Sequence, residues 1–452
     1  MSTVINYILG LGAGIFLPVV MIILGLCIRM KPKRAIIAGL TLGVAFTGMN
    51  VVLNFMTGSV SPAASAFVNN TGIKLNAIDV GWSPISSIAW AWPYALLLFP
   101  LQIGINIAML AFGWTNCLNV DLWNVWNKIL TSVIVVAVTK SVPLAFVASS
   151  IEIIFELKNA DLTQRQIYKI TKIPGVACPH SMNLFCIILA PINRLMDFIP
   201  GLKNSNMDAS KLKEKIGVFG ENSVMGFIIG AGIAAFGGYD LKGILTTAVE
   251  VATSLVLFPM VAKLFMQALA PIADAAGEFM KKRFKGREFY IGLDWPFMAG
   301  SSELWVTMIL LVPFEVGFAI LMAKMGLNNV LPLGGVMAMC IAVPTLVITG
   351  GNIIRMLIMG ILAVPLNLII ATQFSVPITA LAKQVGTIKL AAGQGVTWFG
   401  LEAPVFRWAI SNGLNIVNGN IVGFVLLIAY FALCVWYYKY MSKREEELKE
   451  EQ

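Results

Sequence analysis

The chain is a succession of long apolar runs separated by short polar segments. A transmembrane helix needs about 20 predominantly apolar residues. Eleven runs approach that length, at roughly 7–28, 35–56, 88–112, 129–151, 181–199, 223–238, 243–266, 304–323, 331–349, 353–372 and 416–438. A further piece at 397–410 is apolar but short, and it contains a proline. The pattern predicts an all-α integral membrane protein with about eleven transmembrane helices.

The composition agrees with a membrane location. Hydrophobic residues make up 58% of the 452 residues and charged residues 12%, against about 25% charged in ordinary soluble domains. No polar stretch is long enough for a soluble domain, so we expect one membrane domain over 1–452 with a mixed-charge tail at 439–452. The net charge of +9 comes from short clusters between apolar runs, which is typical of topology signals and argues against nucleic-acid binding.

The basic clusters predict an orientation. Arg29-Met-Lys-Pro-Lys-Arg34 follows the first run, and the strongest cluster is at 281–287. Because cytoplasmic loops carry an excess of lysine and arginine, both loops are expected inside, with the N-terminus outside and the C-terminal tail cytoplasmic. The same count places the basic segment 156–180 outside. Either the rule is overridden there, or 181–199 is a re-entrant hairpin and another run does not cross.

Two segments have the proline and glycine content of broken backbone. Pro174-Gly-Val-Ala-Cys-Pro-His180 contains the only histidine of the chain, and Gln394-Gly-Val-Thr-Trp398, followed by Glu402, is a second such segment. Broken backbone at membrane depth survives only inside protein or beside water, so one or two re-entrant hairpins are expected. Many transporters also contain inverted repeats. Residues 1–200 and 220–410 are the candidate halves of a hidden inverted repeat, although no repeat is visible in the sequence itself.

Polar groups near the apolar runs are the candidates for a binding site, because a charge within a membrane is costly and usually faces a cavity. Asp79-Val-Gly-Trp82 and Gly292-Leu-Asp294-Trp295 each combine an aspartate with glycine and tryptophan. Carboxylates accept hydrogen bonds from hydroxyls, amides bind them both ways, and aromatic faces cover C–H groups, as a polyol requires. The predicted substrate-binding residues are His180, Glu221, Asp79, Asp294, Asn352 and Gln394. The alternative for each acidic residue is a cap at a helix N-terminus.

Signatures of enzymes and of metal sites are missing from the sequence. It contains no GxxxxGK[ST], HExxH or nucleophile-elbow motif. The six cysteines are scattered and form no CxxC pair, and one histidine cannot complete a zinc set. We therefore predict no catalytic residue, no metal and no cofactor, and we interpret His180 as a hydrogen-bonding group.

Ordered motif blocks carry a family resemblance. The blocks are Tyr7-Ile-Leu-Gly-Leu-Gly12, Asp79-Val-Gly-Trp82, Asn119-Val-Asp-Leu-Trp-Asn-Val-Trp126, Pro179-His180, Phe219-Gly-Glu221, Gly238-Tyr-Asp-Leu-Lys-Gly243, Glu288-Phe-Tyr-Ile-Gly-Leu-Asp294 and Gly351-Asn352. With these blocks in this order, the chain resembles the galactitol-type membrane component (enzyme IIC) of the bacterial phosphoenolpyruvate-dependent sugar phosphotransferase system.

The resemblance implies a homodimeric sugar-alcohol permease of the bacterial plasma membrane that works with cytoplasmic IIA and IIB proteins. IIB would phosphorylate the substrate as it is delivered inward, and the related ascorbate-type carriers imply an elevator-like movement. Pro174-Gly175, Ser181 and Gly300–Glu303 depart from the family pattern near the expected site. A related polyol or ketose is therefore the alternative to galactitol.

Without the resemblance, two other classes remain open. An ion-coupled secondary transporter would use the same intramembrane carboxylates as proton carriers. A membrane-embedded enzyme is the third, and the lack of clustered metal or nucleophile motifs argues against it.

Overall fold

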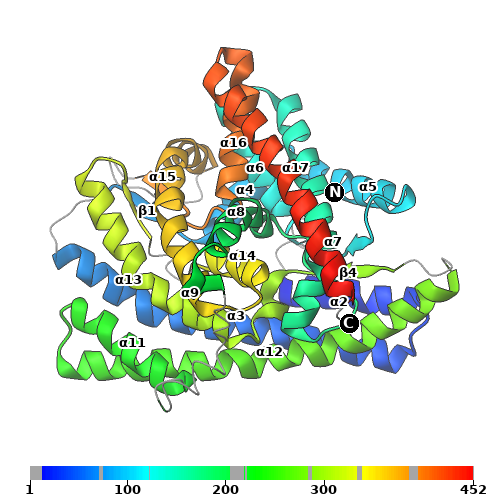
Figure 1. Cartoon of the computed structure of the whole chain (residues 1–452), viewed down its shortest axis with the longest axis horizontal. Coiled ribbons are helices and arrows are strands. Elements are labelled where there is room, and N and C mark those ends of the chain that lie inside the picture. Colours follow the sequence, from blue (N-terminus) through cyan, green and yellow to red (C-terminus); the bar gives the residue numbers. More distant parts are fainter. Residues whose placement is uncertain are drawn as a thin grey trace.

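The computed structural model describes residues 13–70, 75–121, 123–203, 218, 221–283, 288–332, 338–385 and 395–450, and helices dominate it (Figure 1). The α-helices are α2 (Ala13–Cys27), α3 (Pro32–Asn70), α4 (Trp82–Trp90), α5 (Leu98–Ala111), α6 (Val125–Thr139), α7 (Val142–Thr171), α8 (Cys186–Met196), α9 (Pro200–Lys203), α11 (Asn222–Phe236), α12 (Leu241–Arg283), α13 (Ser302–Lys324), α14 (Met339–Thr349), α15 (Ile353–Val385), α16 (Pro404–Leu414) and α17 (Ile421–Glu450). Short 3-10 helices include η2 (Ser181–Phe185) and η4 (Trp295–Met298). The predicted all-α class is confirmed.

Fewer helices than the predicted eleven qualify as full membrane spans in the part of the chain that the structure describes. Within the described ranges, five helices are long and apolar enough to cross a membrane, and a sixth span would be the pair Pro84–Trp90 and Ala95–Ala111, which is bent by 90°. Other predicted runs form short helices, such as α6 and α11 with 15 residues each. At 1.5 Å per residue these reach roughly 22 Å, less than the bilayer core of about 30 Å. The chain is a multi-pass membrane protein, but neither the count of eleven nor the re-entrant hairpins are confirmed.

The run predicted at 129–151 is in fact two helices. Lys140 ends α6 in the left-handed conformation (φ 59°), and the Ser141 hydroxyl caps α7 by accepting a hydrogen bond from the Leu144 N–H at 3.4 Å. Helix α7 then continues to Thr171, well into the basic segment 156–180. A polar face keeps this helix regular beyond the apolar run, because its buried polar side chains pair with other helices.

The charged end of α7 lies beside the charged end of α17. The guanidinium of Arg165 lies 3.6 Å from the Glu445 carboxylate, and Arg444 donates a hydrogen bond to Gln166 at 2.9 Å. These contacts put the basic segment 156–180 and the C-terminal tail on the same side of the molecule. The charge count puts the two on opposite sides of the membrane, so the contacts favour the alternative in which one of the predicted runs does not cross, and the orientation stays a prediction.

Six strands of two or three residues form two parallel sheets within the described residues. One sheet has the order β5-β1-β6, from Val330–Leu331, Ala77–Asp79 and Gly395–Thr397. The other has the order β2-β4-β3, from Cys117–Asn119, Tyr290–Gly292 and Val176–Ala177. In each sheet the central strand comes from one half of the chain and the two outer strands from the other, so both halves are needed to build either sheet.

The elements of the two halves follow one another in the same order. β1 and β4 begin 213 residues apart, as do β2 and β5, and β3 and β6 begin 219 residues apart. Helices α3 and α12 lie side by side (Figure 1) and run antiparallel, because Phe46 packs on Phe265 (ring centroids 5.0 Å apart) while the later Gly48 faces the earlier Val261. These two corresponding helices thus point in opposite directions.

Candidate functional site

Three polar side chains gather at one edge of the sheet β2-β4-β3. Because its strands are parallel, their carboxyl ends meet at the same edge. Asp121 follows β2, His180 follows β3 and Asp294 follows β4. The Nε2 atom of His180 lies 3.2 Å from Asp294 Oδ1. Two of the six predicted site residues, far apart in sequence, are therefore in direct contact.

A glycine permits this approach. A Cβ on Gly292 would lie 2.6 Å from Pro179 Cγ and 2.8 Å from Cys117 Sγ, which are contacts that real Cβ atoms do not make. Only glycine therefore lets β4 pass between the two outer strands. Its close packing brings Asp294 within reach of His180.

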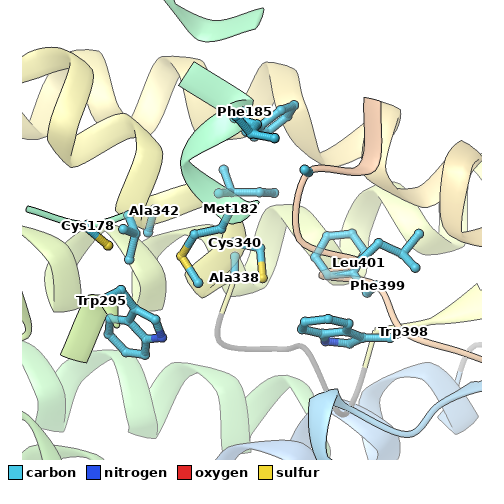
Figure 2. Packing of buried hydrophobic residues seen from close by; sticks show 14 of the residues in the cluster. Cys178, Met182, Phe185, Trp295, Ala338, Cys340, Ala342, Trp398, Phe399 and Leu401 are labelled. Carbon is cyan, nitrogen blue, oxygen red and sulfur yellow. The ribbon is translucent and has the colours of Figure 1, made fainter. Parts of the chain in front are cut away.

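A cavity of about 70 Å³ opens beside this contact. Tryptophans dominate its wall: Trp82, Trp123, Trp126, Trp295 and Trp398, five of the eleven in the chain. The polar lining residues are Asn50, Asn124, His180, Asp294 and Glu402. Figure 2 shows Trp295 and Trp398 on two sides of this region, with Met182 and Cys340 between them. Aromatic faces combined with hydrogen-bonding groups suit a molecule with both C–H and O–H surfaces.

Two contacts assign the tautomer of His180, which is only 2% exposed. The Met182 N–H donates to Nδ1 at 3.3 Å, so Nδ1 is an acceptor and the ring proton lies on Nε2, where it is donated to Asp294. Glu402 Oε2 lies 3.9 Å from Nδ1 and has no hydrogen-bond partner among the described residues. Two acceptors thus face each other across a gap that a donor would fill.

The backbone that carries Glu402 is strained. Leu401, Glu402 and Ala403 have φ values of 45°, 31° and 50°, three consecutive non-glycine residues in the left-handed region. That conformation costs roughly 1–2 kcal/mol per residue and persists only where surrounding contacts enforce it. Arg407 supplies such a contact, because its guanidinium donates a hydrogen bond to the Glu402 carbonyl. The strained turn holds the Glu402 carboxyl at the cavity.

A second buried polar group, here called the ion-pair cluster, lies directly behind His180. It consists of Lys128, Glu152, Glu156 and Arg407, each at most 2% exposed. Lys128 lies 2.5 Å from Glu156, and Arg407 lies 3.4 Å from Glu152. The hydroxyl of Ser181, the residue after His180, reaches both carboxylates, at 2.9 Å from Glu152 and 2.5 Å from Glu156. Each charge is paired, and the cluster contacts the segments of both His180 and Glu402.

Three of the other predicted residues, Asp79, Glu221 and Asn352, are not among the residues that line the cavity. Asp79 is buried at the end of β1, where Oδ1 accepts a hydrogen bond from the Gly81 N–H at 3.1 Å. Glu221 begins α11, and Asn352 caps α15 by accepting from the Arg355 N–H at 3.2 Å. Capping, the alternative given for the acidic residues, is observed at Asp294, which accepts a hydrogen bond from the Trp295 N–H at 2.7 Å. Gln394 lies outside the described residues. A substrate role for Asp79, Glu221, Asn352 and Gln394 stays a prediction.

The structure adds residues that the sequence interpretation had placed elsewhere. Trp82, named above only as part of the Asp79 motif, lines the cavity together with Trp398. Glu402 had been noted only as part of a second broken segment. The sequence feature that marks Glu402 is its position just before Ala403-Pro404 and shortly after Trp398. The approach of Glu402 to His180, more than 200 residues away, cannot be inferred from the sequence.

Five helices of membrane length within the described residues define the class, a multi-pass membrane protein, and its cavity is lined by tryptophans and a few polar side chains. Residues 7–393 match the family described as "PTS system sugar-specific permease component" (EIIC-GAT), and the chain belongs to that family. It is 32% identical over 437 residues, 95% of this chain and 94% of the relative, to the PTS system galactitol-specific EIIC component of Escherichia coli K12. The corresponding protein of Escherichia coli O157:H7 matches equally.

A third relative, a putative permease IIC component of Escherichia coli K12, is 30% identical over 446 residues, 97% of this chain and 99% of the relative. All three matches extend over nearly the whole chain, which agrees with a single membrane unit. The resemblance drawn from the motif blocks is confirmed. The matched proteins are permease components, which transport and do not themselves catalyse.

Proposed function

We propose that this chain binds a neutral sugar alcohol, galactitol or a related polyol, in the cavity between His180, Asp294 and Glu402 and carries it inward across the membrane. The family is one of sugar permeases, and two relatives are named for galactitol. The lining is chemically suited to a polyol, because five indole rings cover C–H faces while carboxylates and amides meet hydroxyls.

The gap between Glu402 Oε2 and His180 Nδ1 carries this proposal. A carboxylate oxygen buried without a donor costs about 1–3 kcal/mol or more. The two acceptors lie 3.9 Å apart, and Oε2 has no donor among the described residues. A substrate hydroxyl at this position would donate its proton to Oε2. An anionic substrate would instead bring its charge to the two cavity carboxylates, so we propose a neutral ligand.

The rest of the transport cycle follows from the family. A cytoplasmic IIB protein, itself served by IIA, would phosphorylate the polyol as it is released inside. The permease would act as a homodimer with its C-terminal tail in the cytoplasm and move by an elevator-like displacement. The chain itself would contribute no catalytic group, metal or cofactor, since the phosphoryl donor is IIB.

We further propose that residues 1–200 and 220–410 are inverted repeats. The matching order and spacing of the strands and the antiparallel packing of α3 on α12 support this. The cavity draws residues from both halves, including Trp82 and His180 from the first and Asp294 and Trp398 from the second. Substrate sites at the interface of two repeats are usual among secondary transporters.

Uptake by membrane vesicles tests the proposal. Labelled galactitol is expected to accumulate as its phosphate, and only when phosphoenolpyruvate and the soluble phosphotransferase proteins are supplied. Accumulation of unmodified polyol, driven by a proton gradient without those proteins, would contradict it.

One observation favours the ion-coupled alternative. Glu315 of α13 is fully buried within a membrane-length helix, and neither carboxylate oxygen has a hydrogen-bond partner among the described residues. Such a group is a candidate proton carrier. In the alternative, Glu315→Gln abolishes proton-driven uptake; in the proposed function it leaves phosphoenolpyruvate-dependent uptake in place.

A further inference from the structure

An apolar groove runs between α7 and α17, two helices that contact each other and are labelled in Figure 1. It has a volume of about 370 Å³, and its lining is almost entirely apolar, including Ile154, Phe155, Phe431, Cys434 and Val435. Its charged lining residues are Lys158 and Lys439. The groove is independent of the cavity beside His180.

The groove has a lysine on each of its two helices, one turn after apolar lining residues, at Lys158 and Lys439. Phe155 packs on Phe431 (ring centroids 5.8 Å apart), and Asn159 accepts a hydrogen bond from the Tyr437 hydroxyl at 2.6 Å, so α7 and α17 run parallel. Lys158 already donates to the Trp114 carbonyl at 2.8 Å, and Leu162 continues the apolar lining of α7 beyond it, so Lys439 is the lysine that marks the charged end. This matches an amphiphile with its chain along the groove and its head at Lys439.

A basic hollow of about 510 Å³ adjoins the charged end, and Lys439 lines both spaces. Arg194, Lys439, Lys443 and Arg444 contribute four positive charges to the hollow, against two negative charges from Asp197 and Glu447. Asp197 pairs with Arg355 at 2.9 Å and with Arg194 at 3.5 Å, and Lys443 lies 3.8 Å from Glu447. The surplus of positive charge selects an anionic headgroup.

Two stacked aromatic rings locate the hollow at the membrane surface. Trp436 and Tyr440 also line it, with ring centroids 5.2 Å apart and planes inclined by 5°. Tryptophan and tyrosine concentrate where hydrocarbon meets water. Basic pockets at that level between membrane helices bind anionic lipid headgroups.

We propose that the groove and hollow together bind one anionic phospholipid, with an acyl chain between α7 and α17 and the phosphate beside Lys439. Lipid bound at this site would also affect the segment that carries His180 at the cavity. Asn159, in the groove wall, donates a hydrogen bond to the Asn183 carbonyl three residues after His180, at 3.1 Å. An acyl chain packed there would steady the helix turn that follows the histidine.

Native mass spectrometry of the full-length protein, in detergent with added phosphatidylglycerol or phosphatidylcholine, tests the site. Wild type is expected to retain phosphatidylglycerol at least fivefold more strongly. Lys439→Gln should lower the preference for phosphatidylglycerol over phosphatidylcholine about fivefold, because a lysine near an anionic surface contributes roughly 1 kcal/mol. The matched control Lys324→Gln, an exposed lysine at the end of α13 that lines neither space, should leave it unchanged.

A groove-filling variant, Cys434→Phe, tests the acyl chain separately and should weaken retention of both lipids. Equal retention of the two lipids by wild type would overturn the proposal, as would equal behaviour of the two lysine variants. Complete displacement of the lipid by millimolar inorganic phosphate would identify a site for free anions and overturn the lipid assignment. Loss of soluble-partner binding in Lys439→Gln, with lipid retention intact, would identify a protein-docking surface instead.

Discussion

Two groups of buried polar residues lie next to each other in this membrane protein, and they differ in how their charges are satisfied. In the ion-pair cluster, Lys128 and Arg407 each lie against a glutamate. At the cavity, His180 and Asp294 contact each other, while Glu402 Oε2 has no hydrogen-bond partner among the described residues. Each charge of the first group lies against an opposite charge, although Glu152 Oε2 also lacks a hydrogen-bond partner there, whereas no lysine or arginine lines the cavity.

The comparison distinguishes polar side chains that stabilise the fold from polar side chains that would bind a substrate. Buried charges are tolerated when they are paired, and each charge of the ion-pair cluster has a partner of opposite sign. It fixes two segments that would otherwise be hard to hold, through Ser181 beside His180 and through the contact of Arg407 with the Glu402 carbonyl. The cavity can then leave an acceptor open because its neighbours are held in place.

Lys128→Met is expected to have the largest effect. It leaves Glu156 buried without its countercharge, which costs about 3–5 kcal/mol of stability. Thermal unfolding in detergent should show a large drop in melting temperature, together with low yield of folded protein.

The double variant Lys128→Met/Glu156→Leu is the matched control. Because it removes both charges, it should recover most of the lost stability. A double variant no more stable than Lys128→Met would mean that the cluster does not act through charge pairing.

Asp294→Asn acts on the other group and is expected to spare the fold. It removes a negative charge at the cavity that would accept a substrate hydroxyl, and hydrogen bonds to charged groups contribute about 1.5–3 kcal/mol. Galactitol affinity should fall roughly 10- to 100-fold by calorimetry, with little change in melting temperature. Asp274→Asn, at an exposed position of α12, should bind as wild type does.

Ser181→Ala tests the link between the two groups. Loss of a hydroxyl that contacts both glutamates should cost about 1–2 kcal/mol of stability and raise the KM for uptake several-fold by loosening His180. Ser132→Ala is its control, since Ser132 is equally buried and bonds to Ser149 at 2.7 Å in a pair that no cavity residue joins. An equal rise of KM in both variants would show that general loosening, not His180, is responsible.

Arg165→Gln should have the smallest effect. Arg165 pairs with Glu288, which is 55% exposed, and with Glu445. Such pairs near water contribute about 0–1 kcal/mol and weaken with salt. Melting temperature should shift by a few degrees at most at low salt, and polyol uptake should be unchanged. A severe defect would show that the α7–α17 junction takes part in transport.

The sequence predicted the membrane class, the family and two contacting site residues, because each depends on local pattern. Hydrophobicity identifies a membrane chain, and His180 and Asp294 stand out by rarity and by their glycine and tryptophan neighbours. The predicted number of membrane spans is not confirmed, because an apolar run of 15 residues looks much like one of 20 in the sequence. Only the longer run is long enough to cross a bilayer.

The remaining errors concern contacts between distant segments. Helix α7 extends through Glu156 because Lys128 of α6 neutralises it, and the sequence does not reveal that pair. Strands of two or three residues have no alternating pattern, yet β4 joins strands more than 100 residues away and brings Asp294 to His180. Glu402 was overlooked as a site residue for the same reason.

The most direct test of the proposed site is the affinity of Glu402→Gln for galactitol, measured by calorimetry on the purified protein beside Glu278→Gln, an exposed control on α12. Glutamine keeps the size of the side chain but removes the charge that would accept the substrate hydroxyl. We predict at least tenfold weaker binding for Glu402→Gln, unchanged binding for Glu278→Gln, and similar melting temperatures for both. Wild-type affinity in Glu402→Gln would contradict the assignment of this cavity as the polyol site.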